Sequence, residues 1–168
     1  MLRRSVGFSD GDVLYTTVTF FAGGLVSLYL WGRVVDRAGA LPVLRATIVL
    51  QGVLALLLGW VGVETGVAPV VLWFFAYSVL VAGFGVADTH LLFQLTPPEA
   101  PARTLVLAAS AAGIATALVP LTAGIVLDAC LPEDPSMGLQ VYRVFFPAAG
   151  IFHALAFLPL RPLGRGRR

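Results

Sequence analysis

Long apolar stretches separated by short polar segments dominate the pattern of this chain. Five stretches lack Asp, Glu and Arg, and they cover residues 13–31, 46–63, 65–87, 104–127 and 144–160. A helix needs about 20 apolar residues to cross the ~30 Å hydrocarbon core of a bilayer, and all five come close to that length. The pattern therefore predicts one transmembrane domain over residues 1–168, an all-α multi-pass bundle of five spans.

A transmembrane β-barrel is the alternative way to satisfy backbone polar groups in lipid, but the pattern argues against it. Barrel strands alternate apolar and polar residues, whereas segments 53–58 and 70–75 are continuously apolar. Glu64 alone separates the second and third stretches. We therefore expect those two spans to form an antiparallel helical hairpin.

The composition supports the membrane assignment. Hydrophobic residues make up 58% of the chain and charged residues 12%, against about 45–50% and about 25% in soluble domains. A soluble domain of this size cannot bury so much apolar surface, which excludes a soluble enzyme and a disordered tail. The eleven basic residues are all arginines scattered between apolar blocks. They indicate contact with a lipid bilayer rather than with nucleic acid.

The arginines also predict an orientation. Eight flank one side of the five spans: Arg33, Arg37, Arg45, Arg103, Arg161, Arg165, Arg167 and Arg168. Three flank the other side: Arg3, Arg4 and Arg143. Arginine accumulates in cytoplasmic loops, so we expect a cell membrane protein (plasma or inner membrane) with its N-terminus outside and its C-terminus in the cytoplasm.

The segment after the first span, residues 32–44, has the most informative spacing. Gly32 would let the end of one helix pack closely, and Gly39 would permit a tight turn with positive φ. Asp36, next to Arg37, could accept hydrogen bonds from backbone amides or from an arginine. This spacing predicts a structural or gating loop, and an ordinary arginine-bearing loop is the alternative.

Gly32, Asp36, Arg37, Gly39 and Leu44 match the loop signature of the major facilitator superfamily, which this segment resembles. The family pattern has two basic residues where this chain has an alanine and a leucine at positions 40 and 41. Segment 95–103 is similar to the connection between the family's tenth and eleventh helices, and segment 138–146 to the entry of its final helix.

This resemblance implies that the five spans correspond to helices eight to twelve of a twelve-helix transporter, with helices two to six as the alternative. It also implies the function of the family, which moves a small solute by alternating access between two helical halves. We therefore expect the chain to be the C-terminal portion of such a transporter. Its partners would be the missing N-terminal helices or further copies of itself.

Ionisable and polar groups inside the spans are candidate functional residues, because they are costly in lipid. Asp88 and His90 lie near the inner end of the third span, and His153 lies in the fifth. They could form a proton-coupled or solute-binding site. Alternatively, Asp88 pairs with an arginine and His153 is a hydrogen-bonded interior residue, and Gln51 is expected to join two helices. The spacing gives no metal site, and we expect no cofactor.

The fourth span is rich in small residues, and Ala109, Gly113 and Ala117 share one face at four-residue spacing. Such faces allow helices to approach closely, which predicts a packed interior helix. No catalytic motif is present, so we expect no enzyme activity. An intramembrane hydrolase would require Ser110 to meet a histidine. The remaining alternatives are a structural or assembly subunit and a small homo-oligomeric channel.

Overall fold

The computed structural model describes residues 7–62, 64–131 and 135–160, with the side chains of 135–137 and 159 left aside. Helices make up almost all of this part of the chain, and it contains no strand. They are α2 (Asp10–Ala38), α3 (Ala40–Leu58), α4 (Val67–Leu95), α5 (Pro101–Cys130), α6 (Pro135–Leu155) and the short 3₁₀ helix η1 (Leu158–Leu160). The predicted all-α class is confirmed.

Four of these helices, α2 to α5, are long and apolar enough to cross a membrane. The predicted fifth span, 144–160, matches the second half of α6 together with η1. α6 begins earlier than expected, includes Arg143, and ends at Leu155. The arginines at positions 3, 4, 161, 165, 167 and 168, on which the predicted orientation partly rests, lie outside the described residues.

The helices extend beyond the apolar stretches that predicted them. α2 continues through Arg33 and Arg37, so the expected loop at 32–44 is mostly helical, which corrects the prediction. The chain changes direction at a single residue, Gly39, whose φ of 87° is in a region that side chains disfavour. At its other end α2 begins with a capping box, in which Ser9 and Asp12 bond each other's backbone amides.

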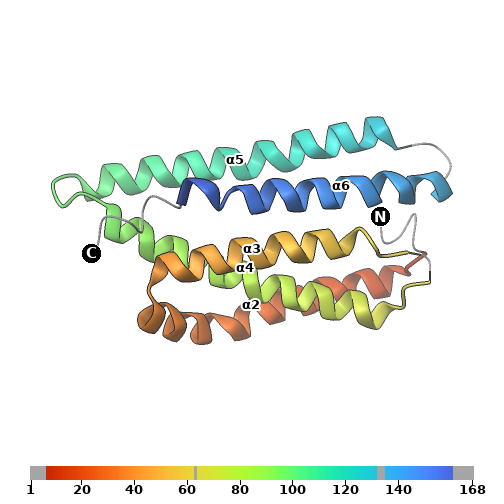
Figure 1. The fold of residues 1–168 in the computed structure, drawn as a ribbon, viewed down its shortest axis with the longest axis horizontal. Coiled ribbons are helices and arrows are strands. Elements are labelled where there is room, and N and C mark those ends of the chain that lie inside the picture. The colour runs from red at the N-terminus through yellow and green to blue at the C-terminus, as the bar shows by residue number, and fades with distance from the viewer. Residues whose placement is uncertain (1–6, 63, 132–134, 161–168) are drawn as a thin grey trace.

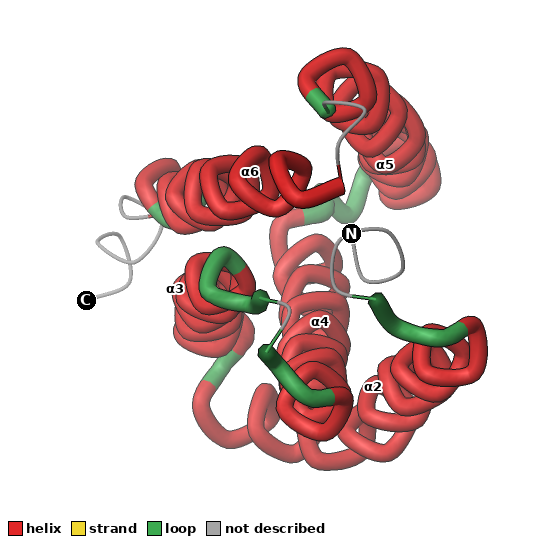
Figure 2. The backbone as a smooth tube through the Cα atoms, turned by 90° about the vertical axis from the view of Figure 1, so that its right-hand side faces the viewer, coloured by secondary structure: helices red, strands yellow, loops and turns green. Residues whose placement is uncertain are grey.

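The helices pack as a layered bundle in which α4 is central. α4 packs along α2 and also contacts α3, and α3 in turn packs against α6, whereas α2 and α3 touch only slightly. The end-on view shows α4 between α2 and α3, with α6 beside α3 (Figure 2). Figure 1 shows α5 running along the outside of this group, next to α6. No residue of α5 is buried.

Two clusters of buried side chains hold the bundle together. One lies at the end where α2 passes into α3, hereafter the arginine end because Arg33, Arg37 and Arg45 are there. It consists of Val35, Ala40, Val43, Leu44, Ile48 and Ala87. The other lies at the opposite end and consists of Phe8, Leu58, Val61 and Val70.

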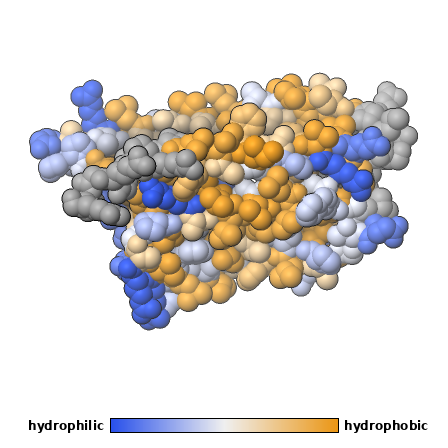
Figure 3. Space-filling view, in the orientation of Figure 1, coloured by the Kyte–Doolittle hydropathy of each residue, from blue (hydrophilic) through white to orange (hydrophobic). Residues whose placement is uncertain are grey.

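The outer surface between the two ends is apolar. Hydrophilic residues gather at the ends of the molecule and hydrophobic residues cover most of the band between them (Figure 3). Large side chains such as Phe21 and Leu25 of α2 are 66% and 76% exposed. A soluble protein would bury such side chains, so this surface fits contact with lipid.

Candidate functional site

Glycines set the closest contacts between α2 and α4. At Gly23 an added Cβ would lie 2.9 Å from the ring of Phe75, and at Gly83 it would lie 2.4 Å from the indole of Trp31. Both glycines therefore provide space that an aromatic ring on the facing helix fills. α2 and α4 therefore run side by side and parallel. Residue 23 faces residue 75, and further along both helices residue 31 faces residue 83.

α3 and α6 also meet through glycines. Cβ atoms built on Gly52 and Gly150 would lie 3.0 Å and 2.8 Å from the facing carbonyl oxygen of the other glycine. Toward the end of α3, Gly59 lies against the ring of Pro147. The small residues that allow close helix approach are thus on α2, α3, α4 and α6, where the sequence pattern had not singled them out.

Side chains that donate to carbonyl oxygens on neighbouring helices connect α4 to both sides of the bundle. Trp31 Nε1 donates to the carbonyl of Val79 at 2.7 Å, and Gln51 Nε2 donates to that of Leu80 at 3.0 Å. Further bonds run from Trp73 Nε1 to Leu54 O at 2.7 Å and from Ser78 Oγ to Phe20 O. The predicted role of Gln51 between helices is confirmed. The sequence did not point to the two tryptophans or to Ser78. Their partners are backbone carbonyl oxygens, which every residue has, so these bonds leave no pattern in the sequence.

The three predicted ionisable groups do not form one site. Asp88 and His90 are exposed at the arginine end of α4, and no ion pair or hydrogen bond of either appears within the described residues. His153 is half-buried on α6, and its Nε2 has no hydrogen-bond partner in that part of the chain. No group of three His, Cys, Asp or Glu residues that could hold a metal occurs there either.

The residues that match the family's loop signature differ in backbone conformation, contacts and exposure. Gly39 adopts the predicted positive φ. At Gly32 an added Cβ would meet nothing within 4 Å in the described chain, so the predicted close helix packing is not found on that side of α2. Asp36 is exposed and accepts no hydrogen bond within residues 7–62, 64–131 and 135–160, because it lies inside a helix whose amides are already bonded. Arg37 lies in the last turn of α2, where its positive charge interacts favourably with the negative end of the helix dipole.

α5 is not the packed interior helix that its small residues predict. Ala109, Gly113 and Ala117 are all exposed, and an added Cβ at Gly113 would meet nothing within 4 Å. The reason is that no described helix lies against this face. A four-residue spacing of small residues makes close approach possible, but it does not supply the neighbour.

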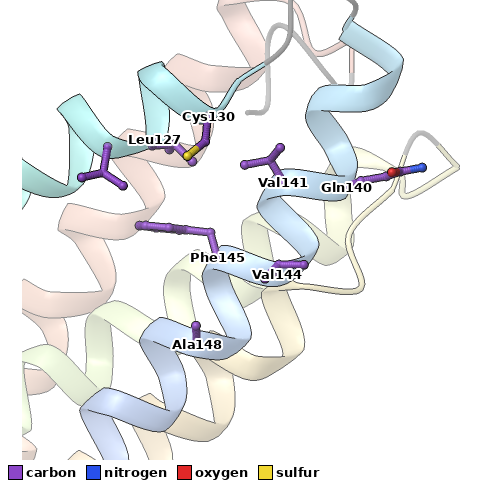
Figure 4. Close-up of a pocket in the computed structure, with 8 residues that line it drawn as sticks. Leu127, Cys130, Gln140, Val141, Val144, Phe145 and Ala148 are labelled. Atoms are coloured by element: carbon purple, nitrogen blue, oxygen red, sulfur yellow. The ribbon is translucent and has the colours of Figure 1, made fainter.

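A cavity of about 540 Å³ lies between the end of α5 and the first half of α6. It is lined by Val126, Leu127, Cys130, Gln140, Val141, Val144, Phe145 and Ala148. In the close-up, Phe145 extends from α6 toward the side where Leu127 of α5 lies, whereas the amide of Gln140 points away (Figure 4). The lining is apolar apart from Cys130 and Gln140, so the cavity offers no cluster of groups for chemistry.

Comparison of the chain with family models, with curated proteins and with solved structures finds no match.

Proposed function

We propose that the chain forms part of a secondary transporter resembling the major facilitator superfamily, which moves a small solute by alternating access. The observation that carries the proposal is α5, which is long and apolar enough to cross a membrane although none of its residues is buried. A helix that lines the passage between two helical halves keeps one face free in its own half, because that face serves the other half. α5 has such a free face at Ala109, Gly113 and Ala117, which are all exposed.

One side of α5 carries small residues, and this supports the role. Ala109, Gly113 and Ala117 follow one another at four-residue spacing, whereas Ile114 and Leu118 lie about 100° further around the helix from Gly113 and Ala117. A small-residue face favours contact with another helix. In this proposal the small face meets the partner half.

The remaining parts of the proposal concern topology and the solute. α6 would be the fifth span, and the arginine end would face the cytoplasm of a cell membrane, which follows the arginine bias. Asp88, His90 and His153 remain the candidate coupling groups. Because they do not meet within the described chain, the partner helices would complete the solute site. Those helices are the missing N-terminal half or a second copy of the chain.

A transport assay with a matched pair of variants tests this function. The chain, with and without co-expressed partner helices, is reconstituted in liposomes, and uptake from a mixture of small solutes is followed by mass spectrometry. Gly113→Leu enlarges the small face, and Ile114→Leu, about 100° around the helix, exchanges one large side chain for another at nearly constant volume. We expect saturable uptake in the assembled form, loss of uptake in Gly113→Leu, and unchanged uptake in Ile114→Leu. Both variants should keep the wild-type melting temperature, because neither residue is buried.

The second candidate function is a structural or assembly subunit that uses the same face of α5 for a permanent helix contact. The fixed glycine contacts between α3 and α6 favour it, because they leave little freedom for rearrangement in that pair. Stable association that Gly113→Leu disrupts, with no saturable uptake in any assembled form, would establish this function and exclude the transporter. Uptake that Gly113→Leu leaves unchanged would contradict the role of α5.

A further inference from the structure

Arg45 differs in burial from the other arginines within residues 7–62, 64–131 and 135–160. The arginines at positions 33, 37, 103 and 143 are exposed, whereas Arg45 of α3 is half-buried. Its Nη2 donates to the carbonyl oxygen of Leu160 at 2.5 Å, and its guanidinium carbon lies 5.9 Å from the centre of the Phe157 ring. Arg45 therefore joins α3 to the segment that follows α6.

Arg45 lies on the side of α3 that packs against α6. Arg45 and Gly52 are seven residues apart, which is close to two turns, so they share one side of the helix. At Gly52 that side lies close to Gly150 and Ala154. α6 ends at Leu155, so no further turn of α6 continues alongside the next two turns of α3 toward Arg45. The long side chain of Arg45 reaches the chain beyond α6 instead.

Residues 156–160, hereafter the strap, continue from α6 as tight turns. The amides of Ala156, Phe157 and Leu160 donate to carbonyls three residues earlier, at 3.1, 3.1 and 3.2 Å. This is the bonding pattern of a 3₁₀ helix. Phe157 and Leu160 also pack against the cluster of buried side chains at the arginine end. The strap therefore covers part of that cluster.

Different contacts hold the strap and α6. On α3, Gly52 and Gly59 face Gly150 and Pro147, which belong to α6 itself. The strap is held by its apolar packing on the cluster and by the hydrogen bond from Arg45. Release of the strap therefore does not require α6 to leave α3.

We propose that the strap closes the arginine end of the bundle reversibly, with Arg45 as its latch. In the closed form the guanidinium donates a charge-assisted hydrogen bond to the final carbonyl of η1. In the open form Phe157 and Leu160 leave the cluster and expose its apolar side chains. Two apolar side chains and the latch hold the strap, so opening is a local event that costs much less than unfolding of the bundle. This inference does not depend on whether the chain transports a solute.

Hydrogen exchange of the whole chain in lipid nanodiscs, followed by mass spectrometry, tests the proposal. Arg45→Met keeps a long side chain and removes the hydrogen-bond donors. We expect the strap amides to exchange about tenfold faster, because loss of a hydrogen bond from a charged group changes an equilibrium by about that factor or more. Exchange in residues 147–154 of α6 should stay at the wild-type rate, because the glycine contacts remain.

Three further variants separate the latch from other causes. Arg37→Met removes the same charge from an exposed position at the same end and should change exchange in neither segment. Gly150→Ala disturbs the contact between α6 and α3, so it should raise exchange in α6 as well as in the strap. Phe157→Ala loosens the strap from its own side and leaves α3 intact, so it should reproduce the local increase.

The pattern of exchange decides the proposal. Wild-type exchange of the strap in Arg45→Met or in Phe157→Ala would overturn it. An equal increase in the strap and in α6 in Arg45→Met would also overturn it, because the strap would then be only the end of α6. The same increase in Arg37→Met as in Arg45→Met would assign the effect to charge alone and contradict the latch. Phe157→Ala decides the question by itself if Arg45→Met does not fold.

Discussion

Gly83→Ala is expected to destabilise the bundle strongly, although it adds a single methyl group. The new Cβ would lie 2.4 Å from the indole of Trp31, far inside contact distance, so the ring has to move. The indole is held by its hydrogen bond to the carbonyl of Val79, and a displaced ring loses that bond. Overpacking costs about 1–3 kcal/mol and the lost hydrogen bond about 1 kcal/mol. We therefore expect a loss of about 2–4 kcal/mol in the free energy of unfolding.

Thermal unfolding in detergent measures this loss. For a chain of this size 1 kcal/mol corresponds to about 2–4 °C, so Gly83→Ala should lower the melting temperature by about 4–16 °C. Gly85→Ala is the matched control, because it makes the same change two residues away where a Cβ meets nothing within 4 Å. Its melting temperature should remain close to that of the wild type.

A double-mutant cycle identifies the cause of the effect. Trp31→Ala removes the ring, so Gly83→Ala should cost almost nothing when it is combined with Trp31→Ala. The reasoning is refuted if Gly83→Ala and Gly85→Ala melt at the same temperature. It is also refuted if the cost of Gly83→Ala persists without the indole.

Four further predictions rest on the backbone conformation, exposure and contacts of single residues. Gly39→Ala, at φ 87°, should lower the free energy of unfolding by about 1–2 kcal/mol. Asp36→Ala should change it by less than about 0.5 kcal/mol, and a larger loss for Asp36→Ala in chemical unfolding would contradict the exposed position of this carboxylate. Gly150→Ala should separate α6 from α3 and increase hydrogen exchange in both helices, whereas Gly113→Ala should leave exchange unchanged. Cys130 is exposed, so a membrane-impermeant maleimide should label it from outside intact cells, and labelling from the inner side alone would reverse the proposed orientation.

Apolar stretches predicted the helices well but not where they end. The apolar stretches were defined by the absence of Asp, Glu and Arg, so the first span was predicted to end at Trp31 and the third at Ala87. The backbone sets the actual ends, because α2 continues to Ala38, directly before Gly39, and α4 continues to Leu95, two residues before Pro97. Polar residues at helix ends project beyond the apolar band without breaking the backbone hydrogen bonds.

The sequence pattern did not predict which helix faces pack together. Ala109, Gly113 and Ala117 form the most regular small-residue face, yet they remain uncovered, while the isolated Gly23 and Gly83 form close contacts. A contact requires a complementary surface on a second helix, here Phe75 and Trp31, and that pairing joins residues about 50 positions apart. Asp88, His90 and His153 illustrate the same point, because only the folded chain shows that they do not meet.

The two kinds of glycine contact in this bundle have different consequences for sequence variation among homologues. At Gly83 the obstacle is a side chain, so a larger residue becomes acceptable when Trp31 is replaced by a smaller one, and the two positions can covary. At Gly52 and Gly150 each glycine faces the backbone carbonyl of the other. No substitution removes a backbone carbonyl, so neither position has a compensating partner. Homologues that keep the α3–α6 contact should therefore keep both glycines, and should show pairwise covariation at 31 and 83 instead.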